Sequence, residues 1–235
     1  MSGRQPTIVA IGGGGFDSDS PTLELDRYLL ALSGVQRPKI CLIPTASGDS
    51  QFRIARFLRA AEAQDCDPGL LEVYRPPAAD LDEYLRGFDV VFVSGGSTRN
   101  LLVLWREWGL DVALHRAWES GTVLAGVSAG ANCWFEACST DSNFGELSAL
   151  SCLGWLPGAF CPHYDTEPER EPSLERMLRT GDLPATLAVG QGTAVRFVGT
   201  ELLEAVACGG PGVAKRISIE SGQRQETLIP VRRLD

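Results

Sequence analysis

A serine set between two glycines, in the pattern Gly-x-Ser-x-Gly at residues 126–130, is the part of this sequence that most directly indicates chemistry. The pattern follows the apolar run at residues 122–125, so Ser128 is expected on a sharp turn from a buried strand into a helix. Such a turn exposes the serine Oγ, and its glycines permit a strained backbone and give a partner side chain room to approach. The pattern therefore indicates a nucleophile for acyl transfer. The alternative is a plain strand–turn–helix connection in which Ser128 caps the helix.

A histidine would activate such a serine as a general base, and the sequence holds two histidines. His163 follows a predicted strand in a Pro-His-Tyr-Asp turn and is the preferred base, whereas His115 lies inside a predicted helix as a surface or packing residue. The N–H of Ala129, next to the nucleophile, and the N–H of Gly95 or Gly96 are candidate donors for an oxyanion hole. Two histidines and the absence of a metal-ligand spacing among the cysteines and acidic residues predict no metal site.

Two glycine-rich loops allow a different interpretation, the binding of a phosphate or a nucleotide. Residues 94–97 could hold a phosphate at a helix N-terminus, but they lack the Gly-Lys-Ser/Thr ending of a P-loop. Residues 12–15 lack the glycine spacing of the dinucleotide-binding fingerprint. A nucleotide site is therefore the weaker hypothesis, and no cofactor is predicted.

The residues alone do not decide which acid would orient His163 and stabilise its charged form. Asp141, Asp165 and Glu136 are the candidates that the sequence offers. Asp165 is two residues from His163, a spacing that is also typical of a side chain that caps a turn.

The elements that must position these groups alternate between strand and helix. Hydrophobic periodicity predicts strands at residues 7–11, 39–44, 71–74, 89–93, 123–125 and 159–161. It predicts helices at residues 21–32, 51–64 and 101–120, the last interrupted at Gly109, and a helical start at Ala129. Residues 139–154 show little periodicity and are predicted to form a loop. This alternation predicts an α/β fold with a mostly parallel sheet flanked by helices.

The segment after residue 186 has a different character. Strand-like runs at residues 187–189, 194–198, 202–207, 212–219 and 225–231, separated by glycine-rich turns, predict antiparallel strands added toward the C-terminus. A single domain over residues 1–235 is the simplest organisation for this length and pattern. Because functional loops lie at the carboxyl ends of parallel strands, five loops are expected to share one crevice. They are residues 12–15, 45–50, 94–100, 127–130 and 163–165.

The composition argues against several classes of partner. Lys and Arg number 21 against 30 Asp and Glu, and this net charge of −9 disfavours nucleic acid and anionic membranes as partners. The 7 cysteines are odd in number and include no Cys-x-x-Cys pair, so we expect reduced and mostly buried thiols. The N-terminus shows no signal-peptide pattern and no apolar stretch approaches about 20 residues, so we expect a cytoplasmic protein.

Five motifs, in this order along the chain, resemble peptidase family S51, the group of peptidase E (aspartyl dipeptidase) and the cyanophycinase-like enzymes. They are IGGGGF at residues 11–16, PTASGDS at residues 44–50, SGGSTRNLL at residues 94–102, AGVSAGA at residues 125–131 and CPHYD at residues 161–165. They span most of the chain. The serine motif together with the glycine-rich motif before it is the most specific part of the resemblance.

The resemblance implies a class I glutamine-amidotransferase-like, or flavodoxin-like, fold in which a serine replaces the nucleophilic cysteine. It also implies a serine exopeptidase that cleaves dipeptides with an N-terminal aspartate, a small acidic substrate, without a metal. A homodimer is a further family-level expectation. By the resemblance, Ser128 is the nucleophile, His163 is the base, and Asp141 falls near the acid assigned to the family's relay.

One position departs from the family pattern. The family carries Glu or Asp in the turn before a late strand, and this sequence has Gln191 there. Glutamine can accept a hydrogen bond from a ring N–H and fix the tautomer, but it carries no charge to stabilise an imidazolium. An amide at such a site can cost on the order of 10⁴-fold in rate. Either Asp141 supplies the acid, or the enzyme is slow, or the protein has another task.

An acidic substrate would be read best by an arginine. Arg170 resembles the family's aspartate-reading arginine, the alternative being an exposed arginine in a charged loop. Arg99 is a second candidate, and Gly95 would let the backbone approach the substrate closely. The alternative functions are hydrolysis of β-aspartyl or other isopeptide bonds, amidase action, and the binding of acidic metabolites by a catalytically impaired protein.

Overall fold

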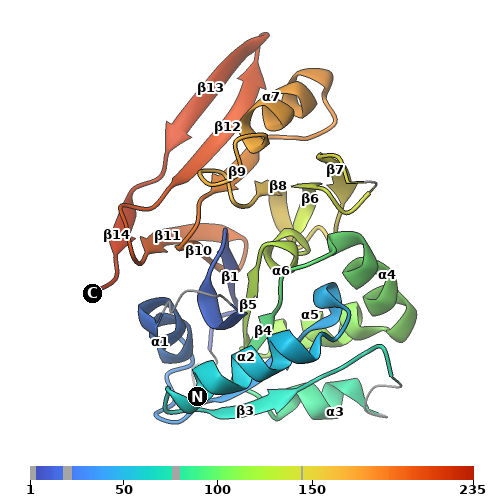
Figure 1. Cartoon of the computed structure of the whole chain (residues 1–235), viewed down its shortest axis with the longest axis vertical. Coiled ribbons are helices and arrows are strands. Elements are labelled where there is room, and N and C mark those ends of the chain that lie inside the picture. Colours follow the sequence, from blue (N-terminus) through green and yellow to red (C-terminus); the bar gives the residue numbers. More distant parts are fainter. Residues whose placement is uncertain (1–3, 18–22, 76–79, 144) are drawn as a thin grey trace.

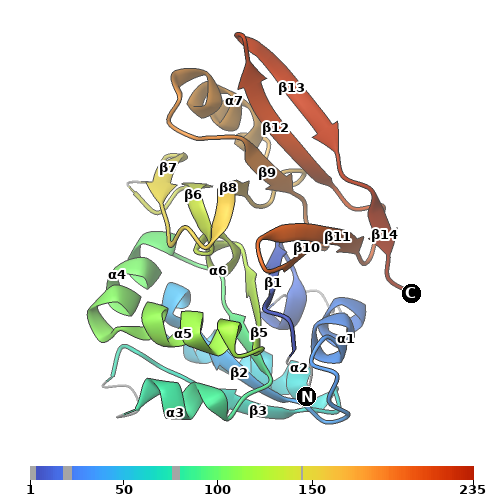
Figure 2. The same cartoon turned by 180° about the vertical axis from the view of Figure 1, so that it is seen from behind.

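The computed structural model describes residues 4–17, 23–75, 80–143 and 145–235, which form two β-sheets with flanking helices (Figures 1 and 2). Among these residues, the larger sheet has eight strands in the order β14-β11-β10-β1-β5-β4-β2-β3. Its strands are β1 (Thr7–Ile11), β2 (Lys39–Ile43), β3 (Asp67–Leu70), β4 (Val90–Val93), β5 (Val123–Val127), β10 (Thr193–Val198), β11 (Glu201–Ala207) and β14 (Val231–Arg233).

The central strands of this sheet are parallel and covered on both faces. β1 pairs with β5, β5 with β4, β4 with β2 and β2 with β3, all in parallel, and every residue of β1, β4 and β5 is buried. α1 (Leu23–Ala31) and α2 (Gln51–Glu62) pack on one face, and α3 (Leu81–Arg86), α4 (Thr98–Trp108) and α5 (Leu110–Glu119) pack on the other. Strands buried in this way need no polar face, which explains their continuous apolar runs.

The smaller sheet stands over the carboxyl ends of the parallel strands, in the upper part of Figure 1. Its order within the described residues is β13-β12-β9-β8-β6-β7. Its strands are β6 (Phe135–Thr140), β7 (Ser148–Ser151), β8 (Leu156–Cys161), β9 (Thr186–Val189), β12 (Ala214–Glu220) and β13 (Gln223–Leu228). α7 (Arg170–Thr180) packs against it, and the short α6 (Ala129–Asn132) contacts strands of both sheets. The turn that carries Ser128 therefore lies where the two sheets meet.

The predicted fold class is confirmed. A parallel core flanked by helices is continued by β10, which pairs antiparallel with both β1 and β11, and β9 pairs antiparallel with β12 in the smaller sheet. The helix predicted at residues 101–120 is divided at Gly109, whose φ of 69° ends α4 and starts α5. Residues 21–22 of another predicted helix, and residue 144 of the predicted loop, lie outside the described residues.

Some predictions of local structure are wrong. The strand expected at residues 71–74 is displaced to β3, because an edge strand tolerates the Pro68 and Gly69 that made this segment look irregular. Residues 139–154 are not a continuous loop, since they include the end of β6 and all of β7. β7 is an edge strand without a buried residue, so its sequence has no apolar alternation to detect. Arg170 opens a helix rather than lying in an exposed loop.

The structure also tests two expectations from the composition, that the thiols are reduced and buried and that no segment is apolar enough to span a membrane. All seven cysteines are free and buried, as their apolar surroundings indicated. No helix among the described residues is long and apolar enough to cross a bilayer.

Candidate active site

Ser128 lies on a strained turn between β5 and α6. Its backbone has φ 54° and ψ −112°, outside the regions that residues with a Cβ ordinarily adopt. Its N–H donates to the Ile11 carbonyl oxygen at 3.0 Å, and its own carbonyl accepts from the Asn132 N–H at 2.8 Å, which starts α6. The turn is tight because its two sides nearly touch: a Cβ on Gly126 would collide with the Gly130 carbonyl. The strand–turn–helix predicted around this serine is therefore present.

His163 directly follows Pro162 at the end of β8 and has the same unusual φ of 54°. Its N–H donates to the carbonyl oxygen of Gly12 at 3.2 Å. Since Ile11 and Gly12 are consecutive, the backbone N–H groups of Ser128 and His163 are hydrogen-bonded to adjacent carbonyl groups at the carboxyl end of β1. Among the described residues, a left-handed φ occurs at four non-glycine positions, of which these are two. Strain of this kind costs about 1–3 kcal/mol per residue and tends to persist at functional sites.

Gln191 is the side-chain hydrogen-bond partner of His163 in the described part of the chain. Its Oε1 lies 3.4 Å from His163 Nδ1. An amide oxygen accepts from Nδ1–H, and this tautomer leaves Nε2 free to act as the base. The carboxylate of Asp165 accepts the Gln191 N–H at 2.7 Å and so fixes the turn that presents the amide. Gly13 leaves room for this contact, because a Cβ there would collide with Gln191 Oε1.

The three candidate acids occupy other positions. Asp141 is exposed after β6, where its carbonyl oxygen accepts from Gly145, and no hydrogen bond among the described residues joins it to His163. Glu136 accepts the N–H of Gly158 at 2.9 Å across β6 and β8. Asp165 acts on the ring through Gln191. The position next to Nδ1 is thus held by Gln191, the residue at which the sequence departs from the pattern of the family it resembles.

The environment of His163 favours the neutral ring. Burial lowers its pKa below the ordinary value of 6.5, because a charged imidazolium is poorly solvated there. Glu167 acts in the opposite direction, Arg170 lowers the pKa further, and Gln191 and Asp165 raise it, but the net direction is downward. A neutral imidazole at pH 7 is the form that a general base requires.

The lowered pKa of His163 predicts how the rate of the proposed reaction depends on pH. With His163 as the base, activity would require the neutral ring, so we expect kcat/KM to be flat around pH 7 and to fall only below the ordinary histidine range. Gln191→Glu places a carboxylate next to Nδ1, which favours the imidazolium and raises the pKa of His163. We expect the acidic limb of the kcat/KM profile to move to higher pH by about one unit or more.

The control for this shift is Gln223→Glu, the same substitution at an exposed position on β13. That variant should keep the wild-type profile. A Gln191→Glu profile identical to that of the wild type would show that the ring contacted by Gln191 is not the titrating base.

The oxyanion-hole candidates flank Ser128 from two loops. Within the described residues, the N–H groups of Gly96 and Ala129 make no backbone hydrogen bond, so both are available to a developing oxyanion. Gly96 has φ 139°, and a Cβ there would collide with the Ala46 carbonyl, so this loop packs tightly against the segment that follows β2. A Cβ on Gly95 would stand 3.4 Å from Ser128 Cβ. These distances and the hydrogen bonds of Ser128 and His163 show that the five predicted loops lie together at one end of the sheet.

Both arginines selected from the sequence, Arg170 and Arg99, donate hydrogen bonds to other residues of the chain. Arg170 is 5% exposed, and it donates through Nε to Glu167 at 2.7 Å and through Nη1 to the Ser139 carbonyl at 3.2 Å. Arg99 is exposed and donates to Asn143 Oδ1 at 2.9 Å. Arg170 interacts electrostatically with His163, so it belongs to the surroundings of the base.

Arg53 lies near the serine, and the sequence analysis did not select it. The position of a Cβ on Gly95 is 3.9 Å from Arg53 Nη1, and this same position is next to Ser128 Cβ. Arg53 is the third residue of α2, which follows the loop at residues 45–50. Its place in the first turn of a helix after a strand's carboxyl end was the available signal.

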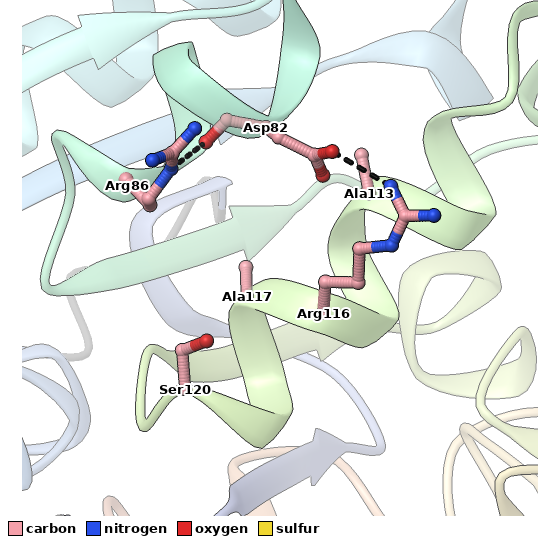
Figure 3. Close-up of a pocket in the computed structure, with 6 residues that line it drawn as sticks. All are labelled: Asp82, Arg86, Ala113, Arg116, Ala117 and Ser120. Carbon is pink, nitrogen blue, oxygen red and sulfur yellow. Dashed lines mark hydrogen bonds and ion pairs between the residues drawn. The ribbon is translucent and has the colours of Figure 1, made fainter.

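A surface pocket of about 200 Å³ lies elsewhere, between α3 and α5 (Figure 3). Asp82 accepts from Arg116 at 2.7 Å across it, and its backbone oxygen accepts from Arg86 Nε at 2.9 Å. Ser120 in its lining precedes β5, whereas Ser128 follows that strand. This pocket is therefore toward the opposite end of the strand from the serine turn and is not the candidate active site.

A serine on a strained strand-to-helix turn, with a histidine attached to the neighbouring strand, is the arrangement of a serine-type hydrolase. The model of peptidase family S51 matches residues 8–205 of the chain. This match agrees with the class of serine-type hydrolases. The chain belongs to peptidase family S51, and hence to the serine-type peptidases.

Similar proteins support the family and the fold. The uncharacterized peptidase YgaJ of Bacillus subtilis strain 168 is 44% identical over 227 residues, which cover 97% of this chain and 98% of YgaJ. The crystal structure of a peptidase from an acI-B1 actinobacterium aligns with a TM-score of 0.66 at 17% identity, covering 96% of this chain and 95% of that one. A protein provisionally named peptidase E from Listeria monocytogenes EGD-e aligns with a TM-score of 0.65 at 20% identity, covering 91% of this chain and 100% of its own.

Proposed function

We propose that this protein is a serine exopeptidase that hydrolyses small peptides, foremost dipeptides with an N-terminal aspartate. The observation that carries the proposal is the pairing of Ser128 and His163. Both have φ 54°, and each donates its backbone N–H to one of two consecutive carbonyl groups at the end of β1. Two strained residues held by one strand end are well suited to act as one nucleophile–base unit.

The proposed mechanism has two stages. Ser128 Oγ attacks the scissile carbonyl carbon, and its proton passes to His163 Nε2. The N–H groups of Gly96 and Ala129 stabilise the oxyanion of the tetrahedral intermediate. The intermediate collapses as His163 gives the proton to the leaving amine, which leaves an ester between the acyl group and the serine. A water molecule, deprotonated by His163, then hydrolyses this ester and restores the hydroxyl.

Gln191 has a defined part in this scheme. It would hold His163 in the tautomer that leaves Nε2 unprotonated, while Asp165 holds Gln191 in place. Because the amide has no charge, the imidazolium formed in each stage would be stabilised by the charge of Glu167, by the hydrogen bond to Gln191 and, to a smaller extent, by the charge of Asp165. This arrangement predicts a slower enzyme than one with a carboxylate at residue 191.

The preference for aspartate is part of the proposal and is supported by the family resemblance and by the arginines near the site. The test is a panel of peptides given to the wild-type protein in the presence of EDTA: Asp-Leu, Leu-Asp, Ala-Leu, β-Asp-Leu and aspartyl-p-nitroanilide. We expect turnover of Asp-Leu and aspartyl-p-nitroanilide. Turnover of β-Asp-Leu alone would make the protein an isopeptidase, and equal turnover of Ala-Leu would remove the acidic preference.

A second candidate function follows from Gln191. A protein with a weakened base could bind acidic metabolites without turnover. It would then show a ligand-dependent rise in Tm with aspartate but no steady-state hydrolysis of any peptide in the panel. A measurable steady-state rate excludes this alternative.

A further inference from the structure

A closed set of hydrogen bonds surrounds Thr98, the first residue of α4, next to the candidate active site. We propose that the hydrogen bond between Thr98 and Asn132 is a positioning contact. It holds the two oxyanion donors, the N–H groups of Gly96 and Ala129, at the separation that catalysis requires. This inference rests on the proposed function, because it concerns the geometry in which the proposed nucleophile works.

Three side-chain hydroxyl groups and one backbone N–H form the closed set around Thr98. The Thr98 N–H donates to Ser142 Oγ at 2.9 Å. Ser142 Oγ lies 2.7 Å from Thr140 Oγ1, which in turn lies 3.5 Å from Thr98 Oγ1. The side chains of Thr98 and Thr140 are buried. Both the backbone and the side chain of Thr98 are therefore held to the end of β6.

Asn132 connects this set to the turn that carries Ser128. Its Nδ2 donates to Thr98 Oγ1 at 3.1 Å, and its backbone N–H donates to the Ser128 carbonyl oxygen at 2.8 Å. Asn132 is the last residue of α6, the short helix that begins with Ala129. Within the described part of the chain, this contact is the side-chain hydrogen bond that joins α4 to α6.

The two residues joined in this way lie close in sequence to the two oxyanion donors. Thr98 follows Gly96 by two positions, and Asn132 follows Ala129 by three. The donors belong to different segments, so the local backbone alone does not fix the distance between them. An oxyanion hole depends on donors that are placed in advance at about 2.7–3.1 Å from the oxyanion. A hydrogen bond between the two segments, next to both donors, supplies this placement.

The side chain of Asn132 costs stability, which argues for a role beyond packing. Its Oδ1 is buried and has no hydrogen-bond partner among the described residues. A buried polar atom without a partner is destabilising, so its presence in a folded protein calls for an explanation other than stability. An apolar side chain would fill the same space without this cost, but it could not donate to Thr98.

The test is Thr98→Val, which keeps the shape of the side chain and removes the hydroxyl group. We expect kcat on aspartyl-p-nitroanilide to fall by about 10- to 100-fold with little change in KM, because a displaced donor weakens the transition state more than the bound substrate. Thr98→Ser restores the hydroxyl and should recover most of the rate. Adding Asn132→Ala to Thr98→Val should cost little more than either substitution alone, since both remove the same hydrogen bond.

Thr186→Val is the matched control for a purely structural effect. Thr186 is also buried, and its hydroxyl donates to the Pro184 carbonyl oxygen at 2.8 Å, at the end of β9 opposite to Gln191. This variant should show a comparable fall in Tm without a fall in kcat. An equal loss of kcat in both valine variants would reveal a general effect of destabilisation and would overturn the positioning role, as would an unchanged kcat in Thr98→Val.

Labelling with a fluorophosphonate separates this inference from the proposed function, because it needs no peptide substrate. Ser128 Oγ forms a bond to phosphorus, its proton passes to His163 and fluoride leaves, while the phosphoryl oxygen takes the place of the oxyanion. Mass spectrometry measures the rate of labelling. Slower labelling in Thr98→Val, with recovery in Thr98→Ser, supports the inference even if no peptide is hydrolysed, an outcome that would overturn only the proposed function.

The remaining outcomes of the labelling also decide. Equal labelling rates in Thr98→Val and the wild type overturn the positioning role and leave the proposed function in place. A wild-type protein that is not labelled at Ser128 and hydrolyses no peptide overturns both, because it has no reactive serine to position.

Discussion

Ser128→Ala is expected to abolish peptide hydrolysis, lowering kcat by about 10⁴-fold or more. In the proposed mechanism this Oγ forms the acyl-enzyme, and the substitution leaves the rest of the site in place. Residues that act as one unit lose most of their effect when the nucleophile is removed. The fold should survive, because alanine and serine have the same backbone restrictions at φ 54°. Steady-state and single-turnover rates on aspartyl-p-nitroanilide measure the effect.

Ser221→Ala is the matched control for this substitution. Ser221 has φ 50° in the exposed turn between β12 and β13, so it combines the same residue type with a similar backbone strain, outside the candidate site. It should retain the wild-type rate. Comparable Tm values for both variants would show that the loss in Ser128→Ala is chemical. A Ser128→Ala protein with more than a tenth of the wild-type rate would remove Ser128 as the nucleophile.

Gly130→Ala is expected to cause a large loss of stability, although it adds only a methyl group. A Cβ at this position would collide with the Val93 carbonyl and stand 2.9 Å from the Ser94 carbonyl oxygen. Both are backbone groups at the end of a buried strand, so they cannot rotate away as a side chain could. We expect the free energy of unfolding to fall by about 3 kcal/mol, or the protein to fail to accumulate in folded form. Urea denaturation measures the change.

Gly210→Ala is the control for this glycine. A Cβ there meets no atom within 4 Å, and its φ lies outside the left-handed region. The substitution should be neutral or stabilise the protein by about 0.4–1 kcal/mol, since it lowers the entropy of the unfolded chain. An unchanged urea midpoint in Gly130→Ala would mean that α6 and the end of β4 can separate without cost, and the tight turn would lose its role in positioning Ser128.

The sequence alone determined those parts of this protein that depend on local pattern. Continuous apolar runs predicted the buried parallel strands, and Gly109 predicted the division between α4 and α5. The spacing around Ser128 predicted its strand–turn–helix connection. These features could be read because a strand buried on both faces, a left-handed glycine and a serine turn each require particular residues within a few positions.

Tertiary structure decided the rest, because it depends on which distant segments meet. β3 and β7 are edge strands with weak apolar patterns, so only their pairing partners define them. The side chain of Gln191 contacts His163 although 28 positions separate the two residues in the sequence. Asp165, two residues after His163, accepts the backbone N–H of Gln191. Arg53 lies beside Ser128 only because the order of β5, β4 and β2 places α2 next to the serine turn. Local periodicity carries no information about such contacts, since the order of strands in a sheet is set by the packing of the whole chain.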